Sequence, residues 1–196
     1  MLGEEHPSTL SSMANLATTY SDQGRWTEAE KIEVQVMETS RRVLGEEHPD
    51  TLSSMANLAS TYSDQGRWTE AEEMFVEVME TSRRVLGEEH PSTLSSIANL
   101  ATTYSNQGRW TEAEKMEVQV METRSRVLGE EHPDTLSSMN NLAFTMKSQD
   151  RTVEAIELMA ECVQLRNRVL GTQHPHALSS AAKLAEWAKH QLTLEL

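Results

Sequence analysis

Several residue types are scarce in this chain of 196 residues, and each shortage excludes something. The single cysteine, Cys162, cannot form an intrachain disulfide, which suits a reducing compartment, so we expect a cytoplasmic location. Only 37% of residues are hydrophobic and 5% aromatic, which is little for one globular core. No apolar run approaches the roughly 20 residues of a membrane span. A stack of small units, each covering one face of the next, needs less apolar material.

Basic residues are also few. Lys and Arg total 17 against 31 Asp and Glu, which gives a formal net charge of −14. Nucleic acids and anionic membranes attract basic surfaces, so we expect no nucleic acid and no membrane as a partner. Charges of both signs are interspersed rather than gathered in blocks, which favours a folded chain over a disordered one.

The dominant feature of the sequence is an internal repeat of 42 residues, a period typical of repeat arrays. The stretch LGEEHPDTLSSMANLASTYSDQGRWTEAE begins at Leu44, and similar stretches begin at Leu2, Leu86, Leu128 and, in divergent form, Leu170. We therefore expect one solenoid domain, 1–196, made of repeats 2–43, 44–85 and 86–127, a divergent repeat 128–169 and a C-terminal capping half-repeat 170–196. Because the first repeat begins directly after Met1, we expect the chain to be a segment of a longer protein.

Each repeat is predicted to form two antiparallel helices. In repeat one, helix A spans about Pro7–Gln23, since its apolar residues recur at helical spacing and proline suits a helix start. Gly24 is expected in the left-handed conformation that ends helices. Thr27–Glu30 resembles a capping box at the start of helix B, which continues to about Leu44. Stacked pairs predict an all-α solenoid of about nine helices, the last at about 176–191.

The repeat resembles a known family. The residues on which this resemblance rests are Asn15, Leu16, Ala17, Tyr20, Gly24, Trp26 and Ala29. They stand at the spacings of the tetratricopeptide repeat (TPR), along essentially the whole chain. The 42-residue unit is similar to that of kinesin light chains and of C-terminal arms of fungal NACHT/NB-ARC receptor-like proteins. This resemblance implies a right-handed superhelix whose A helices line a concave groove, and a non-catalytic role in binding a protein or peptide.

The first candidates for ligand contact are four asparagines of the A helices, which we call the asparagine ladder. They are Asn15, Asn57, Asn99 and Asn141. An amide both donates and accepts hydrogen bonds, so it can hold the backbone of an extended peptide whatever its side chains. The alternative is that each amide bonds the adjacent repeat and fixes the stacking.

Repeat four departs from the pattern. Asn140, Phe144 and Asp150 stand where other repeats have alanine, a hydroxyl residue and glycine. With Asn141 and with Lys183 on the last helix, the first two could form a specific pocket at one end of the groove. The alternative is that terminal repeats differ because they cap the stack.

Other recurrent residues suggest structural roles, and we expect no catalytic residue, no metal and no cofactor. The histidines His6, His48, His90, His132 and His174 lie a full repeat apart, too far to share a metal, so we assign them to helix starts. We assign Trp26, Trp68, Trp110 and Cys162 to the core.

Some positions alternate between odd and even repeats. The sets are Lys31, Glu73, Lys115 and Glu157; Ser8, Asp50, Ser92 and Asp134; and Glu33, Phe75, Glu117 and Met159. We expect the first set to form an exposed row along helix B that fixes register, or else to reflect drift after a pairwise duplication. Repeat one also lacks a polar cap, so the rival hypothesis is a structural module that self-associates head to tail.

Overall fold

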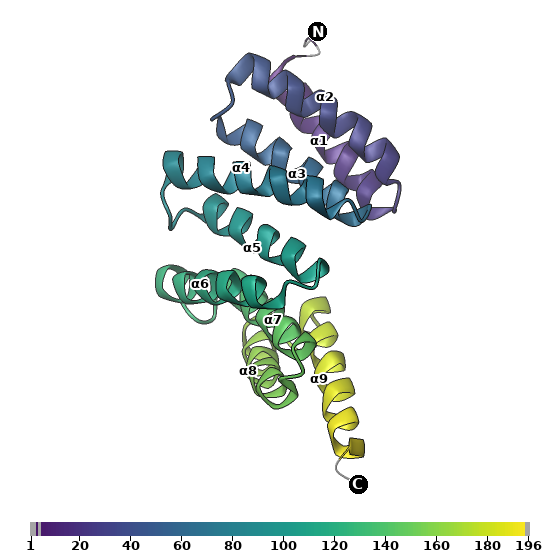
Figure 1. Cartoon of the computed structure of the whole chain (residues 1–196), viewed down its shortest axis with the longest axis vertical. Coiled ribbons are helices and arrows are strands. Elements are labelled where there is room, and N and C mark those ends of the chain that lie inside the picture. Colours follow the sequence, from purple (N-terminus) through teal and green to yellow (C-terminus); the bar gives the residue numbers. More distant parts are fainter. Residues whose placement is uncertain (1–2, 4, 195–196) are drawn as a thin grey trace. The chain divides into compact units, whose positions relative to one another are not determined.

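A computed structural model describes residue 3 and residues 5–194, with side chains as far as Gln191. Nine α-helices make up this part of the chain (Figure 1). They are α1 (Pro7–Asp22), α2 (Trp26–Leu44), α3 (Pro49–Asp64), α4 (Trp68–Leu86), α5 (Pro91–Asn106), α6 (Trp110–Leu128), α7 (Pro133–Ser148), α8 (Thr152–Leu170) and α9 (Pro175–Leu194). The predicted all-α class of tandem helix pairs is confirmed. Within the described residues, no helix is long and apolar enough to cross a membrane.

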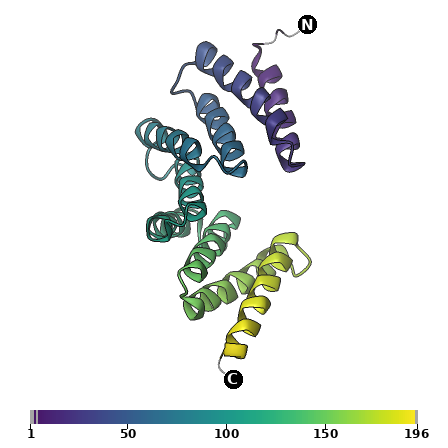
Figure 2. The same ribbon diagram turned by 45° about the vertical axis from the view of Figure 1, so that its right-hand side comes forward.

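The chain forms two compact units, Met1–Gln107 and Gly108–Leu196. In the first unit, α1 to α5 pack in chain order, and the A helices α1, α3 and α5 also touch their neighbours of the same kind (Figure 2). In the second unit, α6 to α9 likewise pack each against the next. Within each unit, successive helices therefore cover one face of the next, as a repeat array requires.

The core of each unit comes from apolar residues at helical spacing. In the first unit, Leu52 and Met55 of α3 pack on Val78 of α4. In the second unit, the thiol of Cys162 is fully buried against α7, where its Sγ donates to the carbonyl oxygen of Leu136 at 3.3 Å. The prediction that Cys162 is a core residue is confirmed.

Local signals at the helix ends behave largely as predicted. His48 precedes α3, and its Nδ1 accepts a hydrogen bond from the backbone N–H of Asp50 at 3.1 Å, as an N-cap does. Gly24 has a φ of 72°, in the left-handed region. Asp150, which replaces that glycine, keeps a φ of 63° at some conformational cost.

The predicted capping box at the start of helix B is wrong. Helix α2 begins at Trp26, so its N-cap is Arg25, two residues before the predicted Thr27, and it makes no side-chain capping bond. Glu28 instead accepts from Nε and Nη2 of Arg25 at 3.0 and 2.9 Å. The guanidinium also lies over the Tyr20 ring, 4.1 Å from its centroid. Glu30, the carboxylate that a capping box would have used, accepts instead from Gln65 and Arg67 of the next repeat.

The assignment of the tryptophans to the core is also wrong in part, since Trp26 and Trp68 are each 39% exposed. They are the first residues of α2 and α4, at the end of the hairpin and off the apolar stripe. Next to this end runs the following A–B turn, from which Nε2 of Gln65 donates to the Trp26 carbonyl oxygen at 3.4 Å.

That turn ties successive repeats together. Glu30 of α2 accepts from Nε2 of Gln65 at 2.8 Å and from Nη1 of Arg67 at 2.9 Å. The same arrangement recurs in the second unit, where Glu114 accepts from Gln149 and Arg151. These partly exposed ion pairs contribute about 0–1 kcal/mol each, so they fix register more than they stabilise.

Candidate functional site

The asparagine ladder lies on the accessible side of the A helices. Asn15, Asn57 and Asn141 are exposed and Asn99 is half-buried. Their side-chain amides have no hydrogen-bond partner among the described residues, so the predicted alternative, a bond to the adjacent repeat, is not made. The four amides are therefore available to an incoming group.

The hydroxyl groups beside the ladder are already occupied. Thr18 donates to the carbonyl oxygen of Ala14 at 3.1 Å, and Ser60 donates to that of Ala56 at 3.0 Å. Ser11 turns back on Pro7 in the same way. These hydroxyl donors are satisfied within their own helices. A ligand backbone can therefore use the amides of the asparagine ladder instead.

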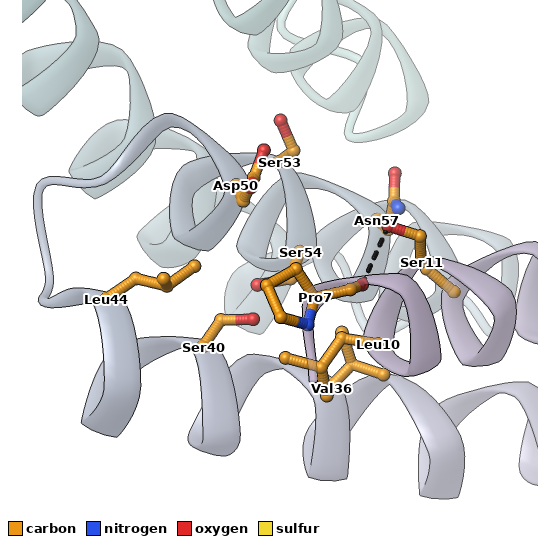
Figure 3. A pocket seen from close by; sticks show the side chains of 11 residues that line it. Pro7, Leu10, Ser11, Val36, Ser40, Leu44, Asp50, Ser53, Ser54 and Asn57 are labelled. Atoms are coloured by element: carbon orange, nitrogen blue, oxygen red, sulfur yellow. Dashed lines mark hydrogen bonds between the residues drawn. The ribbon is translucent and has the colours of Figure 1, made fainter. Parts of the chain in front are cut away.

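Two hollows lie between successive A helices in the first unit, and each holds one ladder residue. One hollow, of about 130 Å³, lies between α1, α2 and α3 and includes Asn57 (Figure 3). A second, also of about 130 Å³, lies between α3, α4 and α5 and includes Asn99. The buried Phe75 of α4 lines this second hollow.

One buried position of the B helices alternates between an acidic and an apolar residue along the repeats. Glu33 and Glu117 stand where repeats two and four have Phe75 and Met159, and all four side chains are buried. Burial raises the pKa of Glu117 to about 7, although a hydrogen bond from the Thr145 hydroxyl acts in the opposite direction. In both glutamates Oε2 is buried with no hydrogen-bond partner in the described structure. Sequence reasoning found the alternation but not this burial.

Burial likewise raises the pKa of Glu33. The Thr61 hydroxyl lowers it, and the carboxylates of Asp64 and Glu30 raise it further. The two units therefore each contain a carboxylic acid that resists ionisation.

The candidates of repeat four have separate partners. The Oδ1 of Asn140 accepts from Oγ of Ser180 at 2.9 Å and from Arg166 at 3.4 Å, which joins α7, α8 and α9. Asn140 is thus held by helix packing, in contrast to the exposed Asn141. Lys183 pairs with Glu186 of its own helix at 2.9 Å.

Phe144 is exposed and packs edge-on against Trp187 of α9, with ring centroids 5.0 Å apart and an interplanar angle of 78°. Sequence reasoning missed Trp187, although its helical spacing from Leu184 was a usable signal. A depression of about 400 Å³ beside it is lined by Lys147, Glu186, Trp187, Lys189 and His190. Phe144 therefore shields the last helix as well as facing solvent.

No group of three His, Cys, Asp or Glu side chains within the described part of the chain is placed to hold a metal ion. The histidines cap the A helices instead, as His6 does for the backbone N–H of Ser8 at 3.1 Å. The arrangement therefore offers unpartnered amides and small hollows rather than a metal site among the described residues.

Comparison with known proteins identifies the repeat. A sequence model of the tetratricopeptide repeat matches residues 9–50, 51–92, 93–134 and 135–176. A putative kinesin light chain of Podosopora anserina, with nearly identical TPR-like repeats, is 33% identical, with a TM-score of 0.79 over 96% of this chain and 90% of that one. The predicted TPR and kinesin-light-chain-like resemblance is thereby confirmed.

Two other structures show likeness of fold alone. BtubC (BKLC) from P. vanneervenii is 21% identical, with a TM-score of 0.71 over 85% of this chain and 66% of that one. The apo form of RapI is 11% identical, with a TM-score of 0.69 over 95% of this chain and 71% of that one. A search of curated protein sequences found no match. The fungal NACHT/NB-ARC context stays a prediction.

Proposed function

This chain belongs to the tetratricopeptide-repeat family, and from that premise we propose that it is a non-catalytic scaffold that binds a protein or peptide along its A helices. We propose further that it is the interaction or sensing arm of a larger cytoplasmic protein. The free thiol of Cys162 supports that location, since disulfides are rare in the reducing cytosol.

The observation that carries this proposal is the set of unpartnered ladder amides. Each amide can donate to a backbone carbonyl and accept from a backbone N–H. Neighbouring hydroxyls such as those of Thr18 and Ser60 do not compete, because they bond their own helices. A polypeptide in extended form presents such groups along its whole length, whereas a small metabolite does not.

The hollows beside Asn57 and Asn99 add side-chain selectivity. A backbone held at a ladder amide places its neighbouring side chains over these spaces. The formal net charge of −14 favours ligands that are neutral or basic.

A peptide-library titration against the chain tests the proposal. The double variant Asn57→Ala, Asn99→Ala should bind the library peptides about tenfold or more weakly, since each lost hydrogen bond to an amide contributes about 1 kcal/mol. Gln35→Ala combined with Gln119→Ala is the matched control, because it removes two exposed amides from B helices. If every ligand binds the asparagine double variant as tightly as the native chain, the ladder does not hold the ligand.

A second candidate function, self-assembly through the repeat ends, is favoured by one observation. Leu16 of α1 is 45% exposed, whereas Leu58 and Leu100, the equivalent residues of α3 and α5, are 1% exposed. Leu178 on α9 is also exposed. Such apolar faces can pair head to tail between copies.

Sedimentation over a concentration series tests this candidate. Association should increase with concentration, and Leu16→Glu should abolish it by placing a charge in the contact. A monomer at every concentration would contradict the assembly proposal and leave the binding proposal untouched.

A further inference from the structure

One buried position of helix B differs in size between the two halves of the chain. It is occupied by Ser40 and Ser82 in repeats one and two and by Arg124 and Arg166 in repeats three and four. All four residues are buried. Serine is much smaller than arginine, so in repeats one and two the space of the arginine side chain is either filled by other groups or open.

The two arginines make the same contacts with the next A helix. Nη1 of Arg124 donates to Oγ of Ser138 at 2.9 Å and to the carbonyl oxygen of Asp134 at 3.3 Å. Arg166 repeats this contact pair one repeat later, with a hydroxyl and a carbonyl of α9. The first two turns of the following A helix thus form a seat for a guanidinium group.

In repeat one the corresponding space is open. The hollow between α1, α2 and α3, which we call the Ser40 hollow, includes Asp50 and Ser54, the equivalents of Asp134 and Ser138 (Figure 3). Leu10 and Val36 line it with apolar surface. Ser40 is only 2% exposed, and its hydroxyl faces the hollow with no hydrogen-bond partner in the described structure.

The serine hydroxyl of the seat bonds a different carbonyl oxygen in the presence and in the absence of the arginine. Ser138, beside a guanidinium, donates to the carbonyl oxygen of Asp134, four residues earlier, at 3.1 Å. Ser54, beside the hollow, donates to Thr51, three residues earlier, at 2.8 Å. In both cases the oxygen lone pairs stay available, so Ser54 can accept as Ser138 does.

We propose that the Ser40 hollow binds the guanidinium of an arginine side chain presented by a peptide or protein ligand. This inference rests on the proposed function and names one residue type that the ligand must offer. The methylene stem lies against Leu10 and Val36, while the guanidinium donates to Oγ of Ser54 and to the carbonyl oxygen of Asp50. Asn57, on the rim, is placed to hold the backbone of the same ligand.

Charge distinguishes the surroundings of Ser40 from those of Ser82. The carboxylate of Asp50 stands at the mouth, 72% exposed, where it attracts a cation. At the equivalent place beside Ser82 the chain has Ser92, which carries no charge. Arginine is preferred over lysine because a planar fork with several N–H donors can serve two acceptors at once, whereas an ammonium is a point charge.

Titration of the full chain with N-acetyl-arginine methylamide, followed by NMR, tests the inference. Saturable shifts are expected for residues around the hollow, including the methyl groups of Leu10 and Val36. The lysine analogue should bind about fivefold more weakly, since it loses one of two directed contacts. The citrulline analogue, which has no charge, should also be weaker than arginine.

Variants locate the effect. Ser40→Arg should abolish the shifts by filling the seat from within, and Ser40→Leu should do the same without adding charge. Ser82→Arg is the matched control for net charge and should leave binding unchanged. Asp50→Asn should weaken binding about fivefold. If Ser40→Arg does not fold, the leucine and asparagine variants decide the matter.

Binding that survives Ser40→Leu, or that is lost equally in Ser82→Arg, overturns the inference. So does the absence of shifts at the hollow. In that case ladder-dependent binding of library peptides would still stand, so the proposed function and this inference can fail separately.

Discussion

Glu117 offers a direct test of how the repeats pack. Its side chain is 5% exposed between α6 and α7, and Oε2 has no hydrogen-bond partner in the described structure. Met159 occupies the same position one repeat later and is fully buried. Glu117→Met therefore replaces an acid with a side chain that the fold already accepts at this position.

The free-energy cost of ionising buried Glu117 follows from its pKa. Burial raises the pKa of Glu117 from its ordinary value of 4.5 to about 7. Each pH unit between these values corresponds to about 1.4 kcal/mol, so ionising the buried acid costs about 3 kcal/mol. Glu114, which adds to this effect, is itself paired with Arg151.

The direction in which stability changes with pH follows from proton binding to Glu117. Between pH 4.5 and about 7 the folded chain keeps the Glu117 proton while the unfolded chain has lost it. The contribution of this group is therefore fully present below pH 4.5, falls as the pH rises and is lost above about 7. Glu117→Met removes that dependence, so its advantage over the native chain should grow by about 3 kcal/mol from pH 4.5 to pH 8.

Urea unfolding followed by circular dichroism at several pH values measures the effect. Glu117→Gln, a neutral isostere, should lose the same pH dependence. Glu122→Gln, on the exposed side of α6, removes an equal charge and should keep it. If the free-energy difference between the native chain and Glu117→Met changes by less than about 1 kcal/mol across this range, the carboxyl is not desolvated as described.

Three further predictions concern single positions. Glu33→Phe should make the unfolding of the first unit less sensitive to rising pH, because burial raises the pKa of Glu33; hydrogen exchange in α2 and α3 across pH 5–8 measures this. Asp150→Gly should raise the unfolding free energy by up to about 1 kcal/mol by relieving a φ of 63°, and Gly66→Asp should lower it similarly in thermal melts. Phe144→Thr should cost about 1 kcal/mol and shift the Trp187 fluorescence to the red, since the aromatic contact is lost.

Most helix boundaries could be predicted because their causes are local. A His-Pro pair starts each A helix through a capping nitrogen and a fixed φ, and a residue with positive φ follows the end of α1, α3, α5 and α7. The ladder could be placed on one face for the same reason, since it depends only on the helical period. The errors lay at Trp26 and at the capping box, where Gln65 and Arg67 of the next repeat bind the Glu30 carboxylate.

The sequence by itself therefore determined the repeat, the alternation of helices and the residues that share an A-helix face. Only the tertiary structure decided that Glu117 is buried, that the amide of Asn140 is occupied and that the space beside Ser40 is open. The reason is physical. Periodicity states which residues of one helix lie together, whereas burial and open space depend on which neighbouring helix covers them and on the size of side chains far away in the sequence.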